Sequence, residues 1–390
     1  MKKLLSVLGS TGSIGLTTLN IVDKKKNYFK PFIFSANKNY KLICKQITKY
    51  RPNYFVINDY KVFKKVKKKF KNINNIKILN NFNFIKLNKK IDVTITAIPG
   101  IQGLKPTILA IKLSKKVLIA NKESIICGWD LIKKNIKKYK TKVIPIDSEH
   151  FSIFKLLQKV NQKDIKKIYI TASGGPFLNF KLNNLKKIKP NQAIKHPKWK
   201  MGKKISIDSA TLMNKVLEVI EAQKIFNISK NKIGVLIHPE SLIHAFIEFK
   251  NGLTYFLYHE TSMTVPIANA IFDSNIEIKK YLKKNKFNFE KNIKNMTFRK
   301  VDSKLFPSIN LIKEINKYPS TSIIVNAVNE ILVDQFLRKN IEFLSIYRTI
   351  KTILNDRNYI KYAIRKPHNI NQITEIDQWA RKLTLKKLKK

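Results

Sequence analysis

The chain has 390 residues, of which 44% are hydrophobic, and a formal net charge of +53 at pH 7. This length and apolar content predict two or three domains with sizeable cores and argue against disorder. No apolar run reaches about eighteen residues, so a membrane-spanning helix is not expected. Cys44 and Cys127 are the only cysteines, which excludes a cysteine-built zinc or iron–sulfur site and fits a reducing compartment.

The positive charge is spread along the chain and is not gathered in one arm. Lysines alternate with Asn, Ile and Phe, as in Lys64–Asn75 and Lys279–Asn295. All four residue types have AT-rich codons, so a biased genome accounts for the charge and no specific nucleic-acid partner is expected. A surface this basic attracts anionic metabolites and binds RNA loosely at low salt. The first apolar run stops at Gly9 without a small-residue cleavage site, so we expect a cytoplasmic protein.

The N-terminal segment predicts a dinucleotide site. A strand over Leu4–Leu8 is followed by the glycine turn Gly9–Gly15 and by a helix over Leu16–Asp23. Glycines in this context let the backbone approach a pyrophosphate at the helix N-terminus, although a plain turn is the alternative. The second strand, Phe32–Phe34, leads into Asn37-Lys38-Asn39. No acid is present there to hold the ribose hydroxyls of NAD, so the lysine favours NADP.

The next segments predict a doubly wound sheet. Strand-like runs alternate with helical patterns in the order Tyr54–Ile57, Tyr60–Phe70, Asp92–Thr96, Leu104–Leu113 and Val117–Ile119. This alternation is typical of parallel strands joined by crossover helices. Two of the strands lead into residues 97–103 and 120–123, at the sheet edge where such folds hold their ligands.

Two acidic residues, Asp147 and Glu149, follow the apolar run Val143–Ile146. Their i, i+2 spacing just past a strand end lets both side chains point to one side. Carboxylates held this close repel one another unless a cation lies between them, and oxygen ligands favour Mg²⁺ or Mn²⁺ over zinc. The alternative is a pair of acids at the start of a solvated loop.

A further candidate site lies on a helix that we expect to begin with Asp208 or Ser209 as its N-cap. On that helix Asn214 and Lys215 precede Glu218 by four and three residues, so the three side chains project to one side. A donor, a cation and a carboxylate beside a free helix N-terminus suit a phosphorylated ligand with a divalent metal. The alternative is a solvated helix face with an ordinary salt bridge.

Two loops flank this candidate site. The strand Ile168–Thr171 ends in Ala172–Phe177, whose backbone amides can face an anion. The segment Lys195–Lys204 has no regular period, and with an exposed-looking Trp199 it suits a lid that closes over substrate. An ordinary surface loop is the alternative for that segment.

The remaining chain predicts a small sheet and then helices. Strands are expected at Ile233–Ile237, Ala245–Phe249 and Leu253–Tyr258, the last two joined by a type I′ turn at Asn251-Gly252. Residues 273–295 are expected to form a connector. From Lys304 onward the pattern is helical, most clearly over Thr321–Leu337 and Ile373–Leu388.

Taken together, these motifs resemble one family, the 1-deoxy-D-xylulose-5-phosphate reductoisomerases. The matching segments follow the family's order over nearly the whole chain: Gly9–Gly15, Ala120–Glu123, Asp147–His150, Ser173–Phe177, His196–Gly202, Ser206–Glu218, His238–His244 and Asn326–Glu330. The resemblance implies an α/β protein and a homodimer. Its domains would be a Rossmann-like doubly wound NADPH-binding domain at 1–146, a central α+β catalytic domain at 147–272 with a lid at about 195–205, a connector at 273–303 and a C-terminal α-helical domain at 304–390.

The resemblance also implies the reaction. A five-carbon ketose phosphate, 1-deoxy-D-xylulose 5-phosphate, would rearrange to a branched aldehyde by retro-aldol cleavage and re-addition. NADPH would then reduce the aldehyde to 2-C-methyl-D-erythritol 4-phosphate, a step of non-mevalonate isoprenoid biosynthesis. The implied cofactors are NADPH and Mg²⁺ or Mn²⁺, with Co²⁺ as a further option.

Site residues follow from the resemblance position by position. The implied metal ligands are Asp147, Glu149 and Glu218, and these acids and Lys122 are the implied catalytic residues. Residues matching substrate contacts are Lys122, Glu123, Ser148, Glu149, Ser173, His196, Ser209, Asn214, Lys215 and Glu218. Residues matching NADPH contacts are Thr11, Gly12, Ser13, Ile14, Asn37, Lys38, Asn39, Asn121, Glu123 and Gly202.

Some positions depart from the family pattern. Val216 stands where the family usually has glycine, and Asn37 also occupies a usual glycine position. Ser262-Met263-Thr264 replaces a usual Asp-Met-Arg, and Pro99 replaces a small or apolar residue. None of these changes removes an implied metal or phosphate ligand, so we expect them to affect efficiency and stability and not the chemistry.

Two other functions fit parts of the sequence. The first is an NADP-linked reductase of a phosphorylated or acidic metabolite that does not isomerise its substrate. Asp147, Glu149 and Glu218 argue against it, because simple hydride transfer needs no metal site built from three carboxylates. The second is a basic RNA-associated protein with a degenerate reductase fold. The acids and glycines of every candidate site are intact, which argues against a degenerate reductase.

Overall fold

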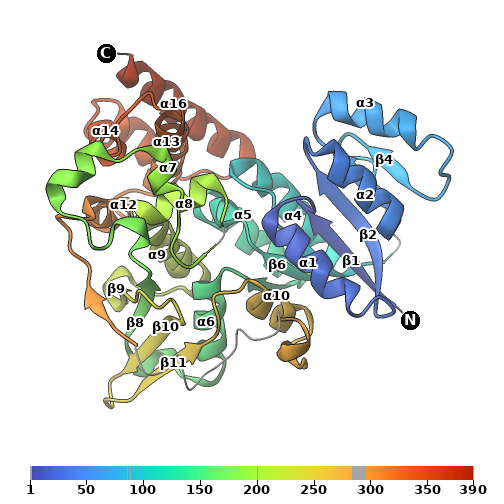
Figure 1. Cartoon of the computed structure of the whole chain (residues 1–390), viewed down its shortest axis with the longest axis horizontal. Coiled ribbons are helices and arrows are strands. Elements are labelled where there is room, and N and C mark those ends of the chain that lie inside the picture. Colours follow the sequence, from blue (N-terminus) through green and yellow to red (C-terminus); the bar gives the residue numbers. More distant parts are fainter. Residues whose placement is uncertain (1, 86, 88, 200, 283–295, 390) are drawn as a thin grey trace. The chain divides into compact units, whose positions relative to one another are not determined.

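The computed structural model describes residues 2–85, 87, 89–199, 201–282 and 296–389 (Figure 1). The chain divides into two compact units. Unit 1 consists of Met1–Ser124, Asp130–Phe151 and Ser262–Lys286, and unit 2 of Ile125–Trp129, Ser152–Thr261 and Phe287–Lys390. Within the described residues, no helix has the length and apolar character needed to cross a membrane. The domain boundaries at 146, 272 and 303 stay predictions.

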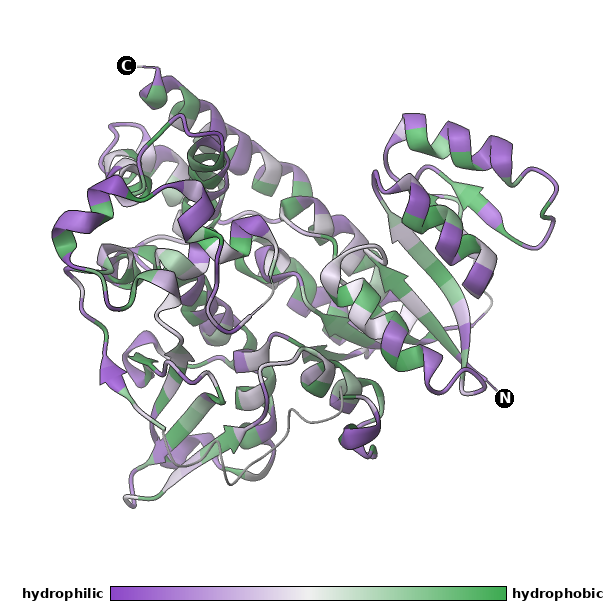
Figure 2. Cartoon of the chain, viewed as in Figure 1, coloured by the Kyte–Doolittle hydropathy of each residue, from purple (hydrophilic) through white to green (hydrophobic). Residues whose placement is uncertain are grey.

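Unit 1 is built on a parallel seven-stranded sheet with the order β4-β3-β2-β1-β5-β6-β7. Its strands are β1 (Lys3–Leu8), β2 (Phe29–Ala36), β3 (Tyr54–Ile57), β4 (Lys77–Leu79), β5 (Ile91–Thr96), β6 (Ser114–Ile119) and β7 (Lys142–Pro145). The strands are largely hydrophobic, as expected for a sheet that is covered on both faces (Figure 2). The strand order reverses beside β1, and this is the point at which doubly wound sheets bind their ligands. The predicted doubly wound α/β fold is therefore confirmed.

Most helices of unit 1 alternate with its strands, and the last one comes from a later segment of the chain. They are α1 (Ser13–Asp23), α2 (Tyr40–Tyr50), α3 (Tyr60–Lys69), α4 (Leu104–Leu113), α5 (Lys122–Tyr139) and α10 (Thr264–Ile271). The first helix begins at Ser13 and not at Leu16, so part of the glycine turn belongs to it. In α3 only Val66 is buried, and its many lysines give it a hydrophilic outer face (Figure 2).

Unit 2 has its own five-stranded sheet with the order β11-β10-β8-β9-β12. Its strands are β8 (Ile165–Ala172), β9 (Ile233–Ile237), β10 (Ile243–Phe249), β11 (Thr254–Tyr258) and β12 (Arg299–Lys300), and only β8 and β9 pair in parallel. Helix α9 (Met213–Phe226) supplies Val219 and Ala222 to the hydrophobic core, which also contains Ile168 from β8 and Ile247 from β10.

The C-terminal helices of unit 2 confirm the helical pattern expected after Lys304. They are α12 (Leu311–Ile315), α13 (Thr321–Leu337), α14 (Ser345–Leu354), α15 (Tyr359–Ala363) and α16 (Ile370–Leu388). Most residues of α13 are buried, because this helix packs against α14, α16 and α8 (Lys203–Ala210). An apolar helix buried on most sides is the expected centre of a helical layer.

Short helical segments complete the described chain. They are η1 (Ile101–Gly103), α6 (Ser148–Leu156), η2 (Leu157–Lys159), η3 (Gln162–Asp164), η4 (Gly175–Phe177), η5 (Leu182–Lys187), α7 (Pro190–Ala193), η6 (Lys230–Lys232), η7 (Ile278–Lys280) and η8 (Pro307–Asn310). Of the expected connector, residues 283–295 lie outside the described residues.

The hairpin of β10 and β11 is present, but its predicted type I′ turn is wrong. A type I′ turn needs positive φ at both central residues, and here Gly252 has φ +87° while Asn251 is not among the residues with positive φ. The turn is closed by a hydrogen bond from Gly252 N–H to Phe249 O (3.2 Å), so the loop is longer than the expected two residues. A single left-handed glycine after a turn is the usual geometry of such longer hairpin loops.

Candidate functional site

The glycine turn of unit 1 leaves the N-terminus of α1 open. Gly9 has φ +92°, and a Cβ atom there would lie 2.5 Å from Ala97 O; at Gly15 it would lie 2.4 Å from Gly9 O. Both positions therefore require glycine. At Gly12 the nearest atom would be 3.4 Å away, so this glycine is not required by the surrounding backbone. Gly12 precedes α1 without any side-chain cap, which leaves the first amides of the helix available to an anion.

A buried glutamine, Gln46 on α2, holds this turn in place. Its Nε2 donates to Ser10 O (2.9 Å), and the Ser10 hydroxyl lies 2.6 Å from Gln46 Oε1. The backbone amides of Gly9 and Ser10 both donate to Ser35 O at the end of β2 (3.1 and 2.8 Å). The turn is thus rigid before any ligand arrives. Sequence reasoning missed Gln46, because nothing in its own segment shows that it faces a turn far away in the chain.

The other residues matched to NADPH contacts lie at helix starts. Asn37, Lys38 and Asn39 are exposed between β2 and α2, and Asn39 caps α2 by accepting from Leu42 N–H (3.2 Å). Asn121 caps α5 in the same way, with Ser124 N–H at 2.6 Å. Thr11, Gly12, Ser13 and Ile14 form the turn and first residues of α1, whereas Gly202 precedes α8 in unit 2. Their roles toward NADPH stay predictions.

Asp147 and Glu149 lie just past β7, as expected, but not on an extended segment. Asp147 directly precedes α6 and Glu149 lies in its first turn, so the two acids lie at a helix start. Within unit 1 the Asp147 carboxylate contacts Lys122 Nζ, 3.3 Å from Oδ2, and His150 Nδ1, 3.3 Å from Oδ1. The His150 side chain is fully buried, so its contact orients the Asp147 carboxylate. The sequence did not indicate this contact.

The stretch Asp208–Glu218 is not one helix, so the expected N-cap at Asp208 or Ser209 is wrong. Both residues lie in the last turns of α8, and α9 starts only at Met213. Between the two helices Leu212 adopts a left-handed conformation with φ +57°. This conformation costs roughly 1–2 kcal/mol for a residue with a Cβ, and the tight helix–helix packing around the buried Leu212 compensates for it.

Asn214, Lys215 and Glu218 do share one side of α9, but that side is buried. Their exposed fractions are 9%, 6% and 1%, so the alternative of a solvated helix face is wrong. Lys215 Nζ lies 2.6 Å from Glu218 Oε2, and Asn214 Nδ2 donates to Glu218 Oε1. The departure Val216 is accommodated on the same helix with its side chain fully buried.

Three acids each offer one carboxylate oxygen as a candidate metal ligand: Asp147 and Glu149 in unit 1, and Glu218 in unit 2. Asp147 and Glu149 are half-buried and Glu218 is buried. The set of donors is purely anionic oxygen, which fits Mg²⁺ or Mn²⁺ and does not suit a soft metal. The assignment of the three acids as ligands of one ion stays a prediction.

Ser173 and His196 form a hydrogen-bonded pair in the loops of unit 2. His196 Nδ1 accepts from Lys198 N–H (3.1 Å) and Trp199 N–H (2.9 Å), so the ring proton resides on Nε2 and is donated to Ser173 Oγ (2.9 Å). Burial, and secondarily the charge of Lys215, lowers the pKa of His196 to about 4. The ring is therefore neutral at physiological pH. Because Ser173 Oγ also accepts from Gly175 N–H (3.1 Å), its own hydroxyl proton remains available to an anion.

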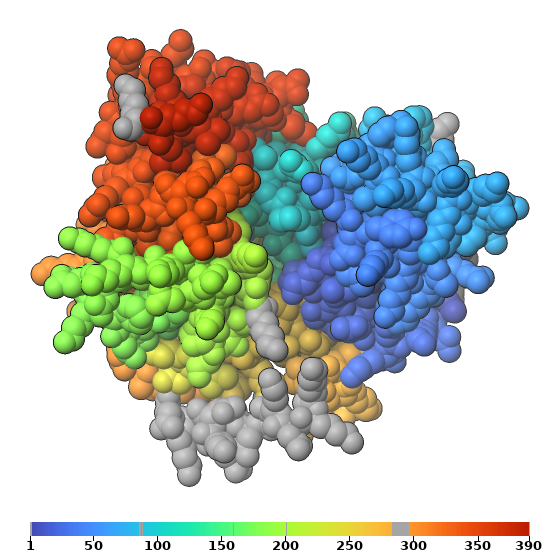
Figure 3. Space-filling view, turned by 45° about the horizontal axis from the view of Figure 1, so that its top comes forward, coloured from blue at the N-terminus to red at the C-terminus, as the bar shows by residue number. Residues whose placement is uncertain are grey.

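The expected lid is partly an irregular surface segment. Residues 195–199 and 201–202 have no regular secondary structure. Figure 3 shows the surface of unit 2 around them. Lys203 and Lys204 already belong to α8, so the expected irregular segment ends earlier than predicted. Trp199 is half-buried and not exposed, because its ring contacts His244 edge-on with centroids 5.9 Å apart. Lys200 lies outside the described residues.

Three family models match the chain. Residues 5–128 match the 1-deoxy-D-xylulose 5-phosphate reductoisomerase model, 143–226 the C-terminal domain model of the same name and 259–383 a DXP reductoisomerase C-terminal domain model. The reductoisomerase of Pelagibacter ubique is 44% identical over 385 residues, covering 97% of both chains. That of Clostridium novyi is 42% identical, covering 90% of this chain and 92% of the relative. The chain belongs to the 1-deoxy-D-xylulose 5-phosphate reductoisomerase family.

Solved reductoisomerases have the same fold. The Zymomonas mobilis enzyme in complex with NADPH is 30% identical with a TM-score of 0.87, covering 100% of this chain and 99% of that one. A reductoisomerase in complex with NADPH, fosmidomycin and magnesium is 29% identical with a TM-score of 0.89, covering 99% and 98%. Family membership and the Rossmann-like α/β fold predicted from the sequence are both confirmed.

Proposed function

We propose that this chain converts 1-deoxy-D-xylulose 5-phosphate to 2-C-methyl-D-erythritol 4-phosphate with NADPH and a divalent metal, as a step of non-mevalonate isoprenoid biosynthesis. It is an NADP-dependent reductoisomerase. The observation that carries the proposal is the set of three carboxylates, Asp147, Glu149 and Glu218, which can supply oxygen ligands to a divalent metal in a chain that is 44% identical to a reductoisomerase over 97% of its length. A reductase that only transfers a hydride has no need for such a set.

The donor set fits a hard divalent ion, and Asp147, Glu149 and Glu218 would hold it. When bound, Mg²⁺ or Mn²⁺ polarises the ketose carbonyl and stabilises negative charge on its oxygen. Two residues near Asp147 would support the same chemistry. Lys122, which is 6% exposed and lies beside Asp147, can stabilise developing negative charge or hold a proton near the reacting oxygens. His150 fixes the orientation of Asp147.

The phosphate of the substrate would be bound by groups of unit 2. Lys215 supplies a buried cation, Asn214 an amide donor, and Ser173 a hydroxyl proton that is left available by its contact with His196. Ser209 contributes a further hydroxyl from the last turn of α8. Binding energy from this remote group holds the carbon skeleton in the reactive orientation. The half-buried Trp199 in the lid excludes water from the aldehyde.

The glycine turn fits NADPH, which supplies the hydride that reduces the aldehyde. A Cβ atom at Gly9 would collide with the backbone of Ala97, and one at Gly15 with the backbone of the turn itself. The uncapped start of α1 leaves amides for the pyrophosphate. Lys38, exposed after β2, would bind the 2′-phosphate of the adenosine.

We also propose that the enzyme is a cytoplasmic homodimer. The chain has only two cysteines, Cys44 and Cys127, and both are buried, which fits a reducing compartment. For the dimer, the support lies in β11, an edge strand that exposes Tyr255 (48%) and Phe256 (54%). An exposed apolar edge strand favours pairing with another chain. The molar mass in solution, measured by light scattering, tests this proposal: a monomer would contradict it.

The reaction itself is tested by following NADPH absorbance with purified protein. We expect oxidation of NADPH only when both 1-deoxy-D-xylulose 5-phosphate and Mg²⁺ or Mn²⁺ are present, with 2-C-methyl-D-erythritol 4-phosphate as the product identified by mass spectrometry. EDTA should abolish the reaction and added Mn²⁺ should restore it. Oxidation that does not depend on metal would support a simple reductase instead.

A further inference from the structure

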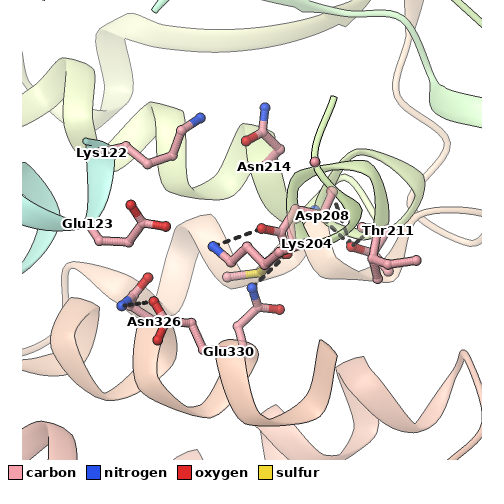
Figure 4. A network of polar contacts seen from close by, with 12 residues as sticks. Lys122, Glu123, Lys204, Asp208, Thr211, Asn214, Asn326 and Glu330 are labelled. Carbon is pink, nitrogen blue, oxygen red and sulfur yellow. Dashed lines mark hydrogen bonds and ion pairs between the residues drawn. The ribbon is translucent and has the colours of Figure 1, made fainter. Parts of the chain in front are cut away.

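Helix α13 presents a polar segment, Asn326–Glu330, inside an otherwise apolar helix. Asn326 and Asn329 are fully buried, and Figure 4 shows Asn326 and Glu330 pointing toward one another on this helix, near Lys204 and Asp208 of α8. Buried amides and carboxylates are costly unless they are hydrogen-bonded, so their retention in a core requires a reason. None of these α13 residues is needed for the metal, phosphate or NADPH contacts described above.

The segment is connected to α8 through Asp208. The Asn329 side chain donates from Nδ2 to Asp208 Oδ1 at 2.7 Å, and both residues are buried. The other carboxylate oxygen, Oδ2, is paired with Lys204 Nζ at 3.0 Å, one turn earlier on α8. With 1% of its surface exposed, Asp208 depends on these two partners, because water cannot replace them.

Helix α13 is itself held in place by contacts with α16. Glu330, one residue after Asn329, is paired with Arg381 on α16, and Arg381 also contacts both oxygens of Asp377 (2.7 and 3.1 Å). Glu330 and Arg381 therefore join α13 to α16 on the side where the two helices face each other. The contact from Asn329 to Asp208 consequently ties α8 to a rigid layer and not to another mobile element.

The position of α8 sets the position of the phosphate-binding groups. Ser209 directly follows Asp208, and a Cβ atom at Gly175 would lie 3.0 Å from Ser209 O, so the loop that carries Ser173 packs closely on this turn. After Ser209 the chain passes through the left-handed Leu212 into α9, which carries Asn214 and Lys215. At the other end, α8 starts where the irregular lid segment ends. A shift of α8 would therefore displace both the phosphate groups and the lid.

We propose that Asn329 is a positioning residue for the phosphate subsite, holding α8 through Asp208 so that Ser209 and the start of α9 meet the phosphate of the substrate. The inference rests on the proposed function, since it concerns the substrate of the same site. Asn329 touches neither substrate nor cofactor. Its contribution is to the affinity for the phosphorylated substrate and not to the chemical step.

The first test replaces the amide with an apolar side chain of similar size. We expect Asn329→Leu to raise the KM for the ketose phosphate about 10- to 100-fold, because a buried hydrogen bond to a charged group is lost. The KM for NADPH should stay within about threefold, and kcat should change less than the KM for the ketose phosphate. Val328→Ala is the matched control, since Val328 is a buried neighbour on α13 whose side chain has no hydrogen-bond donor for Asp208. It should lower the melting temperature without changing either KM.

A second variant separates positioning from a loss of stability. Asn329→Asp keeps the shape but places a carboxyl against the Asp208 carboxylate, and like charge and burial raise the pKa of such a pair. Below that pKa the added group is protonated and can donate to Asp208, so the KM should approach the wild-type value at pH 6. Above it both groups are charged, so the KM should increase toward pH 8.5. A purely structural role predicts no such pH dependence of the ratio of variant to wild-type KM.

The outcomes distinguish this inference from the proposed function. If wild-type protein turns over the ketose phosphate and Asn329→Leu is folded with an unchanged KM, the positioning role is refuted while the proposed function stands. If wild-type protein shows no turnover, the proposed function fails, and inorganic phosphate binding measured by calorimetry decides the inference. Weaker binding by Asn329→Leu than by wild type would support it. Equal binding by both proteins, or binding by neither, would overturn it.

Discussion

The Glu218→Gln variant is expected to remain folded and to bind NADPH, but to turn over the ketose phosphate at least about 1,000-fold more slowly than wild type. Glutamine preserves the size of a side chain that is only 1% exposed, so the packing of α9 should survive. It removes one of three negative charges from the predicted ligand set of Asp147, Glu149 and Glu218. With less charge to balance a divalent ion, both the affinity for metal and the polarisation of the carbonyl decrease.

Two measurements check this prediction. Steady-state kcat at saturating Mn²⁺ gives the loss in rate, and the increase in melting temperature on adding Mn²⁺ gives the loss in metal binding. Lys38→Ala is the comparison, because it removes an exposed side chain on the predicted NADPH side and should cost far less in turnover. If Glu218→Gln retained a kcat near the wild-type value, the three acids would not form the metal site of the reaction.

The second large effect is expected from Lys215→Met, which should reduce kcat/KM for the ketose phosphate about 100- to 1,000-fold. Lys215 is 6% exposed and its ammonium lies 2.6 Å from Glu218, so its charge acts in a poorly solvated place. A divalent ion on Glu218 would repel this ammonium and favour its contact with the substrate phosphate. Methionine keeps the aliphatic stem and removes only the charge, so the loss reports on phosphate binding.

The assay should separate the two roles of Lys215. If the KM for the ketose phosphate increases while Mn²⁺ still raises the melting temperature as in wild type, Lys215 contacts the phosphate. A loss of the Mn²⁺ response as well indicates that Lys215 mainly supports Glu218. Lys230→Met, an exposed lysine that follows the same helix, is the matched control and should be neutral. An unchanged kcat/KM for Lys215→Met would remove Lys215 from the phosphate site.

The local sequence pattern was sufficient to predict the structure wherever a segment determines its own conformation. The strand, glycine turn and helix from Leu4 to Asp23 are present because period, glycine freedom and helix propensity all act over a few residues. In the same way, helical spacing placed Asn214 and Lys215 beside Glu218, and the structure has both contacts. Whether that face is solvated could not be decided from the helix alone, because burial depends on the elements that cover it.

Predictions failed where distant parts of the chain select a locally unfavourable conformation. A leucine rarely adopts positive φ, yet Leu212 does so at the break between α8 and α9, where it is buried. Asp208 has the composition of an N-cap, but it is instead bound inside a helix by Asn329, 121 residues further along the chain. No local signal marks either event.

The amino-acid sequence by itself determined the family, the alternation of strands and helices that is typical of the Rossmann-like unit, and the identity of the candidate acids, because these depend on residue types and short-range spacing. The tertiary structure decided that Glu218 is buried with Lys215, that His196 is neutral against Ser173, and that α8 is anchored to α13. The physical reason is that burial and long-range hydrogen bonding set the energy of a charge or an amide, and both are properties of packed elements and not of a single segment.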